Sequence, residues 1–287
     1  MIDATPDPLV STEWLAEHRK DPDVRIVDSS WYLPAMKRDG RAEYEAAHIP
    51  RTVFWDIETI ADTSTGLPHM MPTPEDFARQ MAAMGIGDDT TVVVYDGIGL
   101  FTAARPWWML RAFGHDKVVI LDGGLPKWMA EGRPVTDRPP LQRTATFTPR
   151  LRPELIRNID AIIENLKTGK EQVVDARSEG RFAGREPEPR PNCRSGHIPN
   201  SRNLPYNHLI DPQTRTVLPR HCLQNRFAGL GIDLSRPVVA SCGSGVSACI
   251  VALALYLIGK TDAAIYDGSW TEWATRADTP VEVNVPA

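Results

Sequence analysis

The sequence predicts an α/β protein of two tandem modules, each a mostly parallel sheet flanked by helices. Three observations lead to this prediction. The chain has 287 residues, which is long for one compact domain and sufficient for two. A set of short motifs occurs twice in the same order. Short apolar strands rich in β-branched residues alternate with helical segments, a pattern typical of parallel sheets that are covered on both faces.

The internal repeat consists of four pairs of motifs at nearly the same separation. The pairs are Ile26–Asp28 with Val173–Asp175, His48–Pro50 with His197–Pro199, Val92–Gly97 with Val238–Gly243, and Asp122–Trp128 with Asp267–Trp273. Chance does not produce four ordered pairs, so the chain contains two copies of one module. We expect an N-terminal domain over residues 1–135 and a C-terminal domain over residues 154–287. Residues 136–153 between them are rich in Pro, Arg and Thr and are predicted to form an extended linker.

The same order of elements is predicted in each module. A helix at 12–18 or 160–166 precedes a short β-branched strand, and a loop with the His-Ile-Pro turn follows. A helix at 75–84 or 221–230 then leads to a buried apolar strand, a further helix, a strand of the type seen at 118–121, and a short helix that carries a Trp. His48 and His197 occupy the same turn in both copies, so we interpret them as structural.

Composition and charge exclude several classes of function. The net charge of −5 does not favour a nucleic-acid backbone or an anionic membrane as a partner. The longest apolar stretch, Cys249–Ile258, is only about ten residues, too short to span a bilayer. The first residues carry acids and prolines where a signal peptide needs a basic start and an apolar core. We therefore expect a soluble, cytoplasmic protein.

The clearest chemical signal is the loop Cys242-Gly243-Ser244-Gly245-Val246-Ser247-Ala248, which follows the buried strand of the second copy. Its glycines let the backbone curl so that successive N–H groups point inward, and the N-terminus of a helix follows. These dipoles favour a thiolate or a persulfide anion on the cysteine. We predict that Cys242 is the nucleophile and that Gly243, Gly245, Val246 and Ser247 line its substrate-binding site. The alternative from the motif alone is a helix-entry turn that contains a core cysteine.

The first copy serves as an internal comparison for this loop. Asp96, also followed by glycine, stands at the position of Cys242, so the fold does not require cysteine there and the N-terminal module is expected to be non-catalytic. A phosphatase loop would need an arginine about six residues after the cysteine to clamp the phosphoryl oxygens. That position is Ala248, so the loop lacks the arginine and a phosphatase is excluded.

The other cysteines show neither a CxxC pair nor the spacing of zinc ligands. We expect Cys222 and Cys249 to be small buried hydrophobic residues. Cys193 lies in a loop rich in Pro and Arg and is expected to be an exposed thiol.

With the repeat, the single second-copy nucleophile and the loop in hand, the sequence resembles the tandem-domain rhodanese family of sulfurtransferases over essentially its whole length. The loop is close to the Cys-Gly-Ser-Gly-Val-Thr-Ala of the branch that uses 3-mercaptopyruvate, with Ser247 in place of Thr. Relatives that use thiosulfate carry a basic Cys-Arg-Lys-Gly-Val-Thr loop, since cationic side chains suit a doubly charged inorganic donor. The resemblance therefore implies two rhodanese-like modules and 3-mercaptopyruvate as the sulfur donor.

The resemblance also implies the residues that surround the nucleophile. The segment Gly180–Arg190 matches the family's substrate-binding stretch and assigns the grip on the substrate carboxylate to Arg181 and Arg190, and Arg105 matches a further arginine of that pocket. A guanidinium group can engage the carboxylate and carbonyl oxygens of an α-keto acid together. The family's serine–histidine–acid relay falls on Ser244, His69 and Glu58, where the closest pattern has Asp in place of Glu58.

The reaction implied is transfer of sulfur through a persulfide on Cys242, with release of pyruvate. The outer sulfur then passes to thioredoxin, a small dithiol or cyanide, and no metal or organic cofactor is expected. Two alternatives stay open: a thiosulfate sulfurtransferase with the same nucleophile, and a non-catalytic tandem module that only binds partners.

Overall fold

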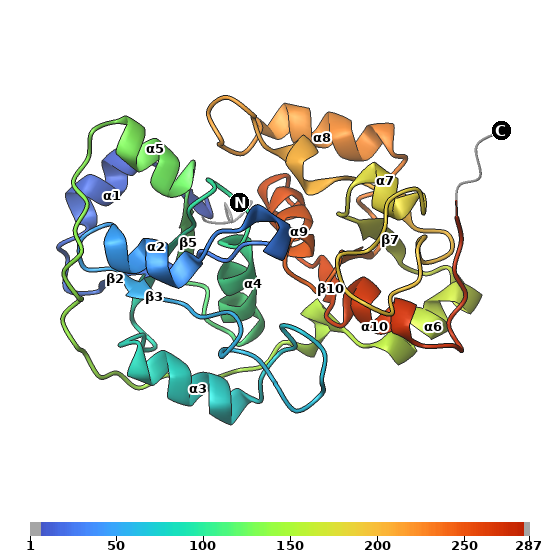
Figure 1. Ribbon diagram of the computed structural model, residues 1–287, viewed down its shortest axis with the longest axis horizontal. Helices are drawn as coiled ribbons and strands as arrows, with labels where there is room; N and C mark the ends of the chain where they lie inside the picture. The colour runs from blue at the N-terminus through green and yellow to red at the C-terminus, as the bar shows by residue number, and fades with distance from the viewer. Residues whose placement is uncertain (1–6, 284–287) are drawn as a thin grey trace. The chain divides into compact units, whose positions relative to one another are not determined.

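The computed structural model describes residues 7–283 as two compact units (Figure 1). Unit 1 comprises Met1–Asp62, Met71–Arg152 and Asp211–Val217, and unit 2 comprises Thr63–Met70, Pro153–Ile210 and Leu218–Ala287, each within the described residues. Each unit therefore includes one short segment from the other half of the sequence. The expectation of no signal peptide rested on residues 1–14, of which the first six lie outside the described residues.

Unit 1 is built on a five-stranded sheet in the order β1-β5-β4-β2-β3, and all of its strand pairs are parallel. Its strands are β1 (Leu9–Val10), β2 (Val24–Asp28), β3 (Val53–Phe54), β4 (Thr91–Tyr95) and β5 (Val118–Leu121). Its helices are α1 (Thr12–His18), α2 (Gly40–Ala46), α3 (Pro74–Ala83), α4 (Ala104–Ala112) and α5 (Gly124–Ala130), with a 3₁₀ helix at Pro34–Met36.

Helices cover both faces of this sheet. Leu15 of α1 and Trp128 of α5 pack in one cluster with Val93 and Tyr95 of β4. Because successive side chains of a strand point to opposite faces, Val94 points to the other face. It is fully buried too, which explains why β4 reads as a continuous apolar run.

Unit 2 repeats this architecture strand for strand. Its sheet has the order β6-β10-β9-β7-β8, again with parallel pairs throughout. The strands are β6 (Ile156–Arg157), β7 (Gln172–Asp175), β8 (Arg202–Asn203), β9 (Val238–Ser241) and β10 (Ala264–Tyr266). The helices are α6 (Ile159–Thr168), α7 (Glu179–Phe182), α8 (Arg220–Gly229), α9 (Ala248–Leu257) and α10 (Ser269–Thr275), with 3₁₀ helices at Pro153–Leu155 and Tyr206–Leu209.

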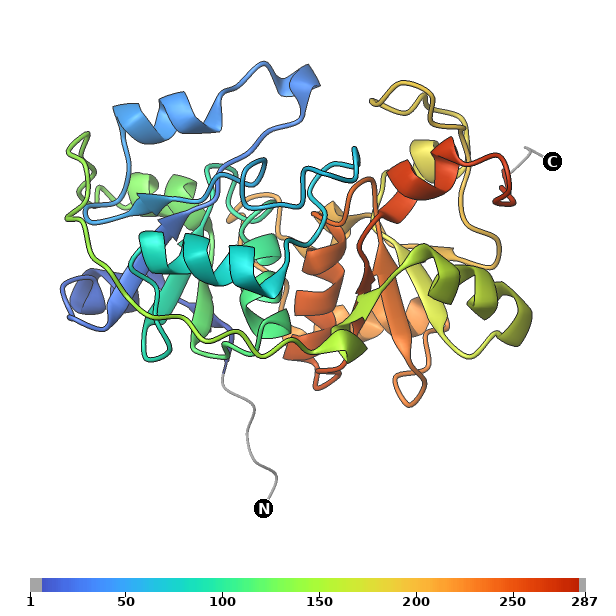
Figure 2. The same ribbon diagram turned by 90° about the horizontal axis from the view of Figure 1, so that it is seen from below.

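The predicted fold class is confirmed by these two sheets. The helices predicted at 12–18, 75–84, 160–166 and 221–230 are all present, with ends within two residues of the prediction. Figure 2 shows each sheet from a second side, with helices packed around it.

The longest apolar stretch of the chain forms α9, whose residues are almost all buried against the sheet of unit 2. It is the core helix that follows the nucleophile loop. Within residues 7–283, no helix has the length and apolar character that crossing a membrane requires.

The repeated His-Ile-Pro turns have the same role in both units. His48 is buried, stacks on Tyr44 and bonds the Tyr44 carbonyl through Nδ1 at 2.7 Å. His197 is likewise buried, stacks on Phe182 and bonds the Phe182 carbonyl through Nδ1 at 2.8 Å. Both rings tie a turn to a neighbouring backbone segment, which confirms that they are structural.

Candidate active site

Cys242 is the first residue after β9 and is 1% exposed. Its backbone is fixed on both sides by the start of α10. Its N–H donates to Ser269 Oγ at 3.2 Å, and its carbonyl accepts from the N–H of Trp270 at 2.9 Å. Gly245, three residues later, has a φ of +74°, a conformation that favours glycine and lets the loop curl before α9 begins.

The two predicted substrate arginines of the Gly180–Arg190 segment meet at the residue next to the nucleophile. A Cβ atom placed on Gly243 would lie 3.3 Å from Arg181 Nη2 and 3.5 Å from Arg190 Nη1. A methyl group at this position would therefore touch both guanidinium groups. Two cationic groups beside a cysteine form a site for a small anion.

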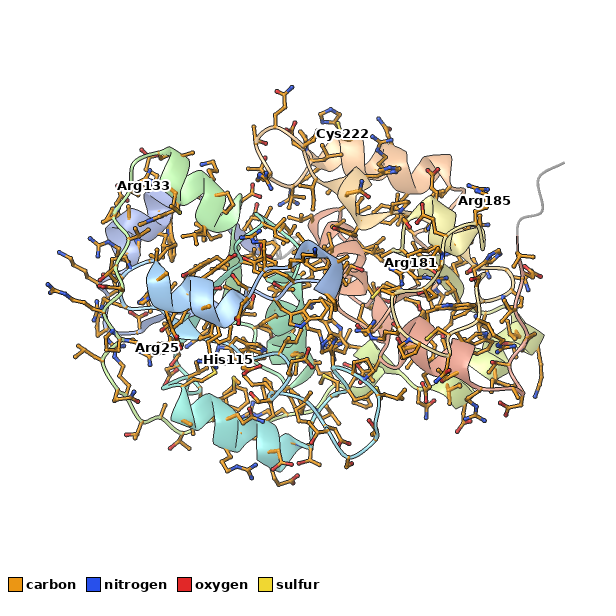
Figure 3. All side chains as sticks on the ribbon, in the orientation of Figure 1. Arg25, His115, Arg133, Arg181, Arg185 and Cys222 are labelled. Carbon is orange, nitrogen blue, oxygen red and sulfur yellow. The ribbon has the colours of Figure 1, made fainter. Side chains whose placement is uncertain are left out.

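Glu188, which the sequence analysis did not single out, holds Arg181 in place. The side chain of Glu188 is 3% exposed, and its carboxylate accepts from Arg181 Nε at 3.2 Å and also from Arg181 Nη2. The same carboxylate accepts from Arg177 Nη1 at 2.7 Å, and Arg177 bonds Asp175 at the end of β7. Arg181 is thus anchored to the sheet through a chain of buried charges. Figure 3 shows Arg181 and Arg185 around α7, and Arg185 is exposed.

Ser244 links Arg190 to His69. Arg190 Nη2 donates to Ser244 Oγ at 3.1 Å, and His69 Nδ1 lies 3.0 Å from the same oxygen. Since the arginine uses an acceptor position of Ser244 Oγ, the hydroxyl hydrogen can be directed at His69 Nδ1 when that nitrogen carries no proton. The pair of Ser244 and His69 is therefore connected by a hydrogen bond, as a proton relay requires.

His69 reaches this position because its segment, 63–70, belongs to unit 2. It is 2% exposed and has a φ of +61°, an uncommon conformation for a residue other than glycine. Its own sequence context, a proline-flanked loop, suggested a surface histidine. Burial against Ser244 is a tertiary contact that no local pattern indicates.

Glu58 and Arg105 lie in unit 1. Glu58 is exposed, and its Oε1 accepts from Trp31 Nε1 at 2.7 Å. Arg105 is fully buried in α4, with its guanidinium 4.8 Å from the ring centre of Trp108. Without the family resemblance, Arg105 reads as a solvated loop arginine, and its burial in a helix corrects that reading.

The first copy shows what this type of loop binds. The carboxylate of Asp96, at the position of Cys242, accepts hydrogen bonds from five backbone N–H groups of its own loop. They belong to Ile98 at 2.9 Å, Gly99 at 3.0 Å, Phe101 at 2.7 Å, Thr102 at 2.8 Å and Ala103 at 3.0 Å. The loop after the fourth strand of the sheet can therefore converge its amides on an anion, and in unit 1 a built-in carboxylate occupies that place.

The remaining cysteines differ in part from expectation. Cys249 is buried in α9 as predicted, and its thiol donates to the Gly245 carbonyl at 3.1 Å. Cys222 is only half-buried, at the start of α8 (Figure 3), with its Sγ 3.3 Å from His221 Nε2, so its assignment to the core was wrong. Cys193 packs partly against the core of unit 2, and burial raises the pKa of its thiol, so it is not a simply exposed thiol.

Two positions that the sequence analysis missed were nevertheless visible as patterns. Glu188 stands two residues before Arg190 in Glu186-Pro187-Glu188-Pro189-Arg190, between the two predicted arginines. Ser269 follows the repeated Asp-Gly pair, where the first copy has Gly124. Glu188 could have been found as an acidic residue between two arginines, and Ser269 as a serine at a position where the first copy has glycine.

With the geometry in hand, comparison with known proteins assigns the family. The model of the Rhodanese-like domain matches residues 11–131 and 158–276. The chain belongs to the rhodanese-like family. This membership confirms the resemblance drawn from the sequence, including the two tandem copies. Relatives at 44% and 45% identity that are named sulfurtransferases show that the chain is a sulfurtransferase.

Similar proteins cover nearly the whole chain. Thiosulfate/3-mercaptopyruvate sulfurtransferase 1, mitochondrial, of Arabidopsis thaliana is 45% identical over 97% of this chain and 79% of its own length. The 3-mercaptopyruvate sulfurtransferase of Homo sapiens is 44% identical over 94% of this chain and 92% of its own length. The crystal structure of SseA of Escherichia coli, a 3-mercaptopyruvate sulfotransferase, is 36% identical, covers 92% of this chain and 98% of its own, and superposes with a TM-score of 0.83.

Proposed function

We propose that this rhodanese-like protein transfers the sulfur of 3-mercaptopyruvate through a persulfide on Cys242 to a thiol acceptor or to cyanide, with release of pyruvate. The observation that carries the proposal is the approach of Arg181 and Arg190 to Gly243, the residue beside the nucleophile. A donor that carries its reactive sulfur two carbons from a carboxylate suits this arrangement. The names of relatives at 44% and 45% identity support the same donor.

The arginines are arranged to orient an α-keto acid. Glu188 occupies Nε and Nη2 of Arg181, whereas Nη1 makes no hydrogen bond within residues 7–283 and can take a substrate oxygen. Arg190 contributes a second cation, with Nη1 near the loop and Nη2 on Ser244. Carboxylate and keto oxygens bound here would direct the thiol sulfur toward Cys242. We propose that Arg105 supplies a further contact to the same carboxylate.

The first half-reaction forms one bond and breaks another. The Cys242 thiolate attacks the substrate thiol sulfur, an S–S bond forms, and the S–C bond breaks with its electron pair left on the pyruvate enolate. The enolate carbon takes up a proton, which gives pyruvate, and Cys242 is left as a persulfide. We propose that Ser244 and His69 pass this proton and that Glu58 orients His69.

The second half-reaction regenerates the enzyme. A thiolate of the acceptor, thioredoxin or a small dithiol, attacks the outer sulfur, the S–S bond breaks, and the Cys242 thiolate returns. Cyanide takes the same sulfur as thiocyanate. Gly243, Gly245, Val246 and Ser247 would line the space that the outer sulfur enters. The N–H of Gly245 donates to Ser269 Oγ at 3.1 Å, so the amides of the other three residues would stabilise the negative charge, as the amides of the Asp96 loop stabilise a carboxylate.

Thiosulfate is the second candidate donor. The thiosulfate sulfurtransferase of Cricetulus griseus is 42% identical over 96% of this chain and 95% of its own length. Two arginines also suit a sulfonate. The loop itself, Cys242-Gly243-Ser244-Gly245, has no basic side chain, which favours the keto acid.

The deciding experiment compares steady-state sulfur transfer from 3-mercaptopyruvate and from thiosulfate, in wild type and in Cys242→Ser. We expect a much larger kcat/KM for 3-mercaptopyruvate and no turnover of either donor in the variant. A larger kcat/KM for thiosulfate would assign the second donor instead. Turnover that survives in Cys242→Ser would overturn the persulfide mechanism, and a wild type inactive with both donors would favour a non-catalytic binding module.

We infer a cytoplasmic location from the composition of the sequence, although one relative is named mitochondrial. Fractionation of cells that express the tagged full chain tests this point. Recovery with an organelle or a membrane would overturn it.

A further inference from the structure

Ser269, the first residue of α10, combines complete burial with an uncommon backbone conformation. It is 0% exposed and has a φ of +50°. A residue with a Cβ atom is held in this region at a cost of about 1–3 kcal/mol, and such residues gather at functional sites. The reason for a serine here is found in its hydroxyl group.

The hydroxyl of Ser269 has its full set of hydrogen bonds, and two of them hold the nucleophile loop. It donates to the Tyr266 carbonyl at 2.7 Å. It accepts from the N–H of Cys242 at 3.2 Å and from the N–H of Gly245 at 3.1 Å. A hydroxyl has one donor and two acceptor positions, so Ser269 Oγ is saturated by these three groups.

In unit 1 the corresponding loop is held by different groups. Gly124 stands at the position of Ser269 with a nearly identical φ of +54°, and a Cβ atom on it would lie 2.6 Å from the Asp96 carbonyl oxygen. The N–H of Gly99, the counterpart of Gly245, donates instead to Asp96 Oδ1 at 3.0 Å. In unit 1 the side chain at the nucleophile position thus holds its own loop.

A cysteine cannot do this without engaging its sulfur. We propose that Ser269 is a positioning residue that replaces the loop-holding carboxylate of the first copy, so that the Cys242 sulfur stays available for the incoming sulfur atom. The inference rests on the proposed persulfide chemistry. Because Ser269 fixes the N–H groups of Cys242 and Gly245, the loop keeps its shape whether Cys242 carries a thiolate or the larger persulfide.

The test uses Ser269→Gly, which removes the hydroxyl and also tolerates the positive φ, as Gly124 does. Ser269→Ala serves as a second variant that keeps the Cβ atom. The matched control is Ser201→Ala, because the Ser201 hydroxyl also donates to a carbonyl three residues earlier, that of Ile198, at 2.6 Å, and it lies outside the loop. Active sites are titrated by the burst of pyruvate released in the first turnover.

We expect Ser269→Gly to lower the burst rate and kcat per titrated site by about 10- to 100-fold, the size of effect that a small misplacement of a reacting group produces. KM for 3-mercaptopyruvate should change less than kcat, since Glu188 holds Arg181 independently of the loop. Hydrogen exchange at the amides of Cys242 and Gly245 should accelerate in the variant. Ser201→Ala should match wild type in all these measurements.

Two results would overturn the inference while the proposed function stands. One is an unchanged kcat per titrated site with unchanged amide exchange in Ser269→Gly. The other is a loss of activity that only follows the loss of titratable sites, as general destabilisation would produce. Failure of the wild type to use 3-mercaptopyruvate would count against the proposed function, and the exchange measurement would still decide the role of Ser269.

Discussion

Replacing Gly243 with alanine should impair substrate binding and leave the fold intact. The added Cβ atom would lie 3.3 Å from Arg181 Nη2 and 3.5 Å from Arg190 Nη1, and no backbone atom lies within 4 Å of it apart from its own neighbours. Ordinary van der Waals contact is about 3.5–4.0 Å, so the Arg181 group must move away by a few tenths of an ångström. The methyl group would also fill part of the space between the two cations.

The size of the effect follows from what the arginines would lose. A hydrogen bond between charged groups contributes about 1.5–3 kcal/mol, so displacing one such contact to the substrate carboxylate should lower kcat/KM about 10- to 150-fold. Most of the change should appear in KM. Stability should be unchanged or slightly higher, because Gly243 does not have a positive φ and alanine restricts the unfolded chain, an effect of about 0.4–1 kcal/mol.

The assay measures kcat and KM for 3-mercaptopyruvate together with unfolding in denaturant. The control is Gly229→Ala in α8, where nothing lies within 4 Å of the added Cβ atom, and it should gain up to about 1 kcal/mol without any kinetic change. An unchanged KM in Gly243→Ala would refute the placement of the substrate between Arg181 and Arg190.

Two further predictions concern buried carboxylates. Glu188→Gln removes the charge that Arg177 and Arg181 share, and should destabilise the protein by about 3 kcal/mol and lower kcat/KM about tenfold. The control is Glu186→Gln at an exposed neighbouring position, which should change neither quantity. Equal unfolding midpoints for the two variants would contradict this prediction. In Asp28, burial raises the pKa to about 6 from 3.8, so the folded state binds a proton that the unfolded state releases, and stability falls as pH rises from about 4 to about 6. Asp28→Asn keeps the acceptor oxygen for the two Ser30 bonds, and its free energy of unfolding should exceed that of wild type by up to about 3 kcal/mol as the pH rises across that range. A difference that does not depend on pH would contradict the raised pKa of Asp28.

Those parts of the site that lie in one local motif could be predicted from the sequence. The duplicated order of strands and the Cys242 loop after a buried strand belong to continuous segments whose residue types indicate their chemistry. Arg181 and Arg190 also lie in one continuous segment, but only the family resemblance assigned them to the substrate. The parallel sheets followed from uninterrupted apolar runs, because strands buried on both faces show no alternation. For this reason the fold could be predicted from the sequence more completely than the site.

The remaining parts depend on contacts between distant residues. His69 and Ser244 are 175 positions apart, and nothing near His69 in the sequence signals its burial. Ser269 acts through backbone N–H groups, whose direction depends on the curl of a loop 24–27 positions away. The placement of Cys222 failed for a related reason: the weakly amphipathic sequence of α8 does not reveal which side of the helix faces the core.

The two copies together lead to a last prediction about Asp96. Its carboxylate accepts five amides in a buried loop, so it is the internal anion around which that part of unit 1 is folded. Asp96→Asn keeps one acceptor oxygen and replaces the other with a donor, which leaves at least two of these buried N–H groups without an acceptor, at about 1–3 kcal/mol each. We expect a loss of roughly 2–5 kcal/mol in denaturant unfolding, with kcat per titrated site unchanged because the nucleophile lies in the other copy. A stable Asp96→Asn would mean that the loop holds its shape without an anion, and the argument that the Cys242 loop is shaped to receive one would lose its structural basis.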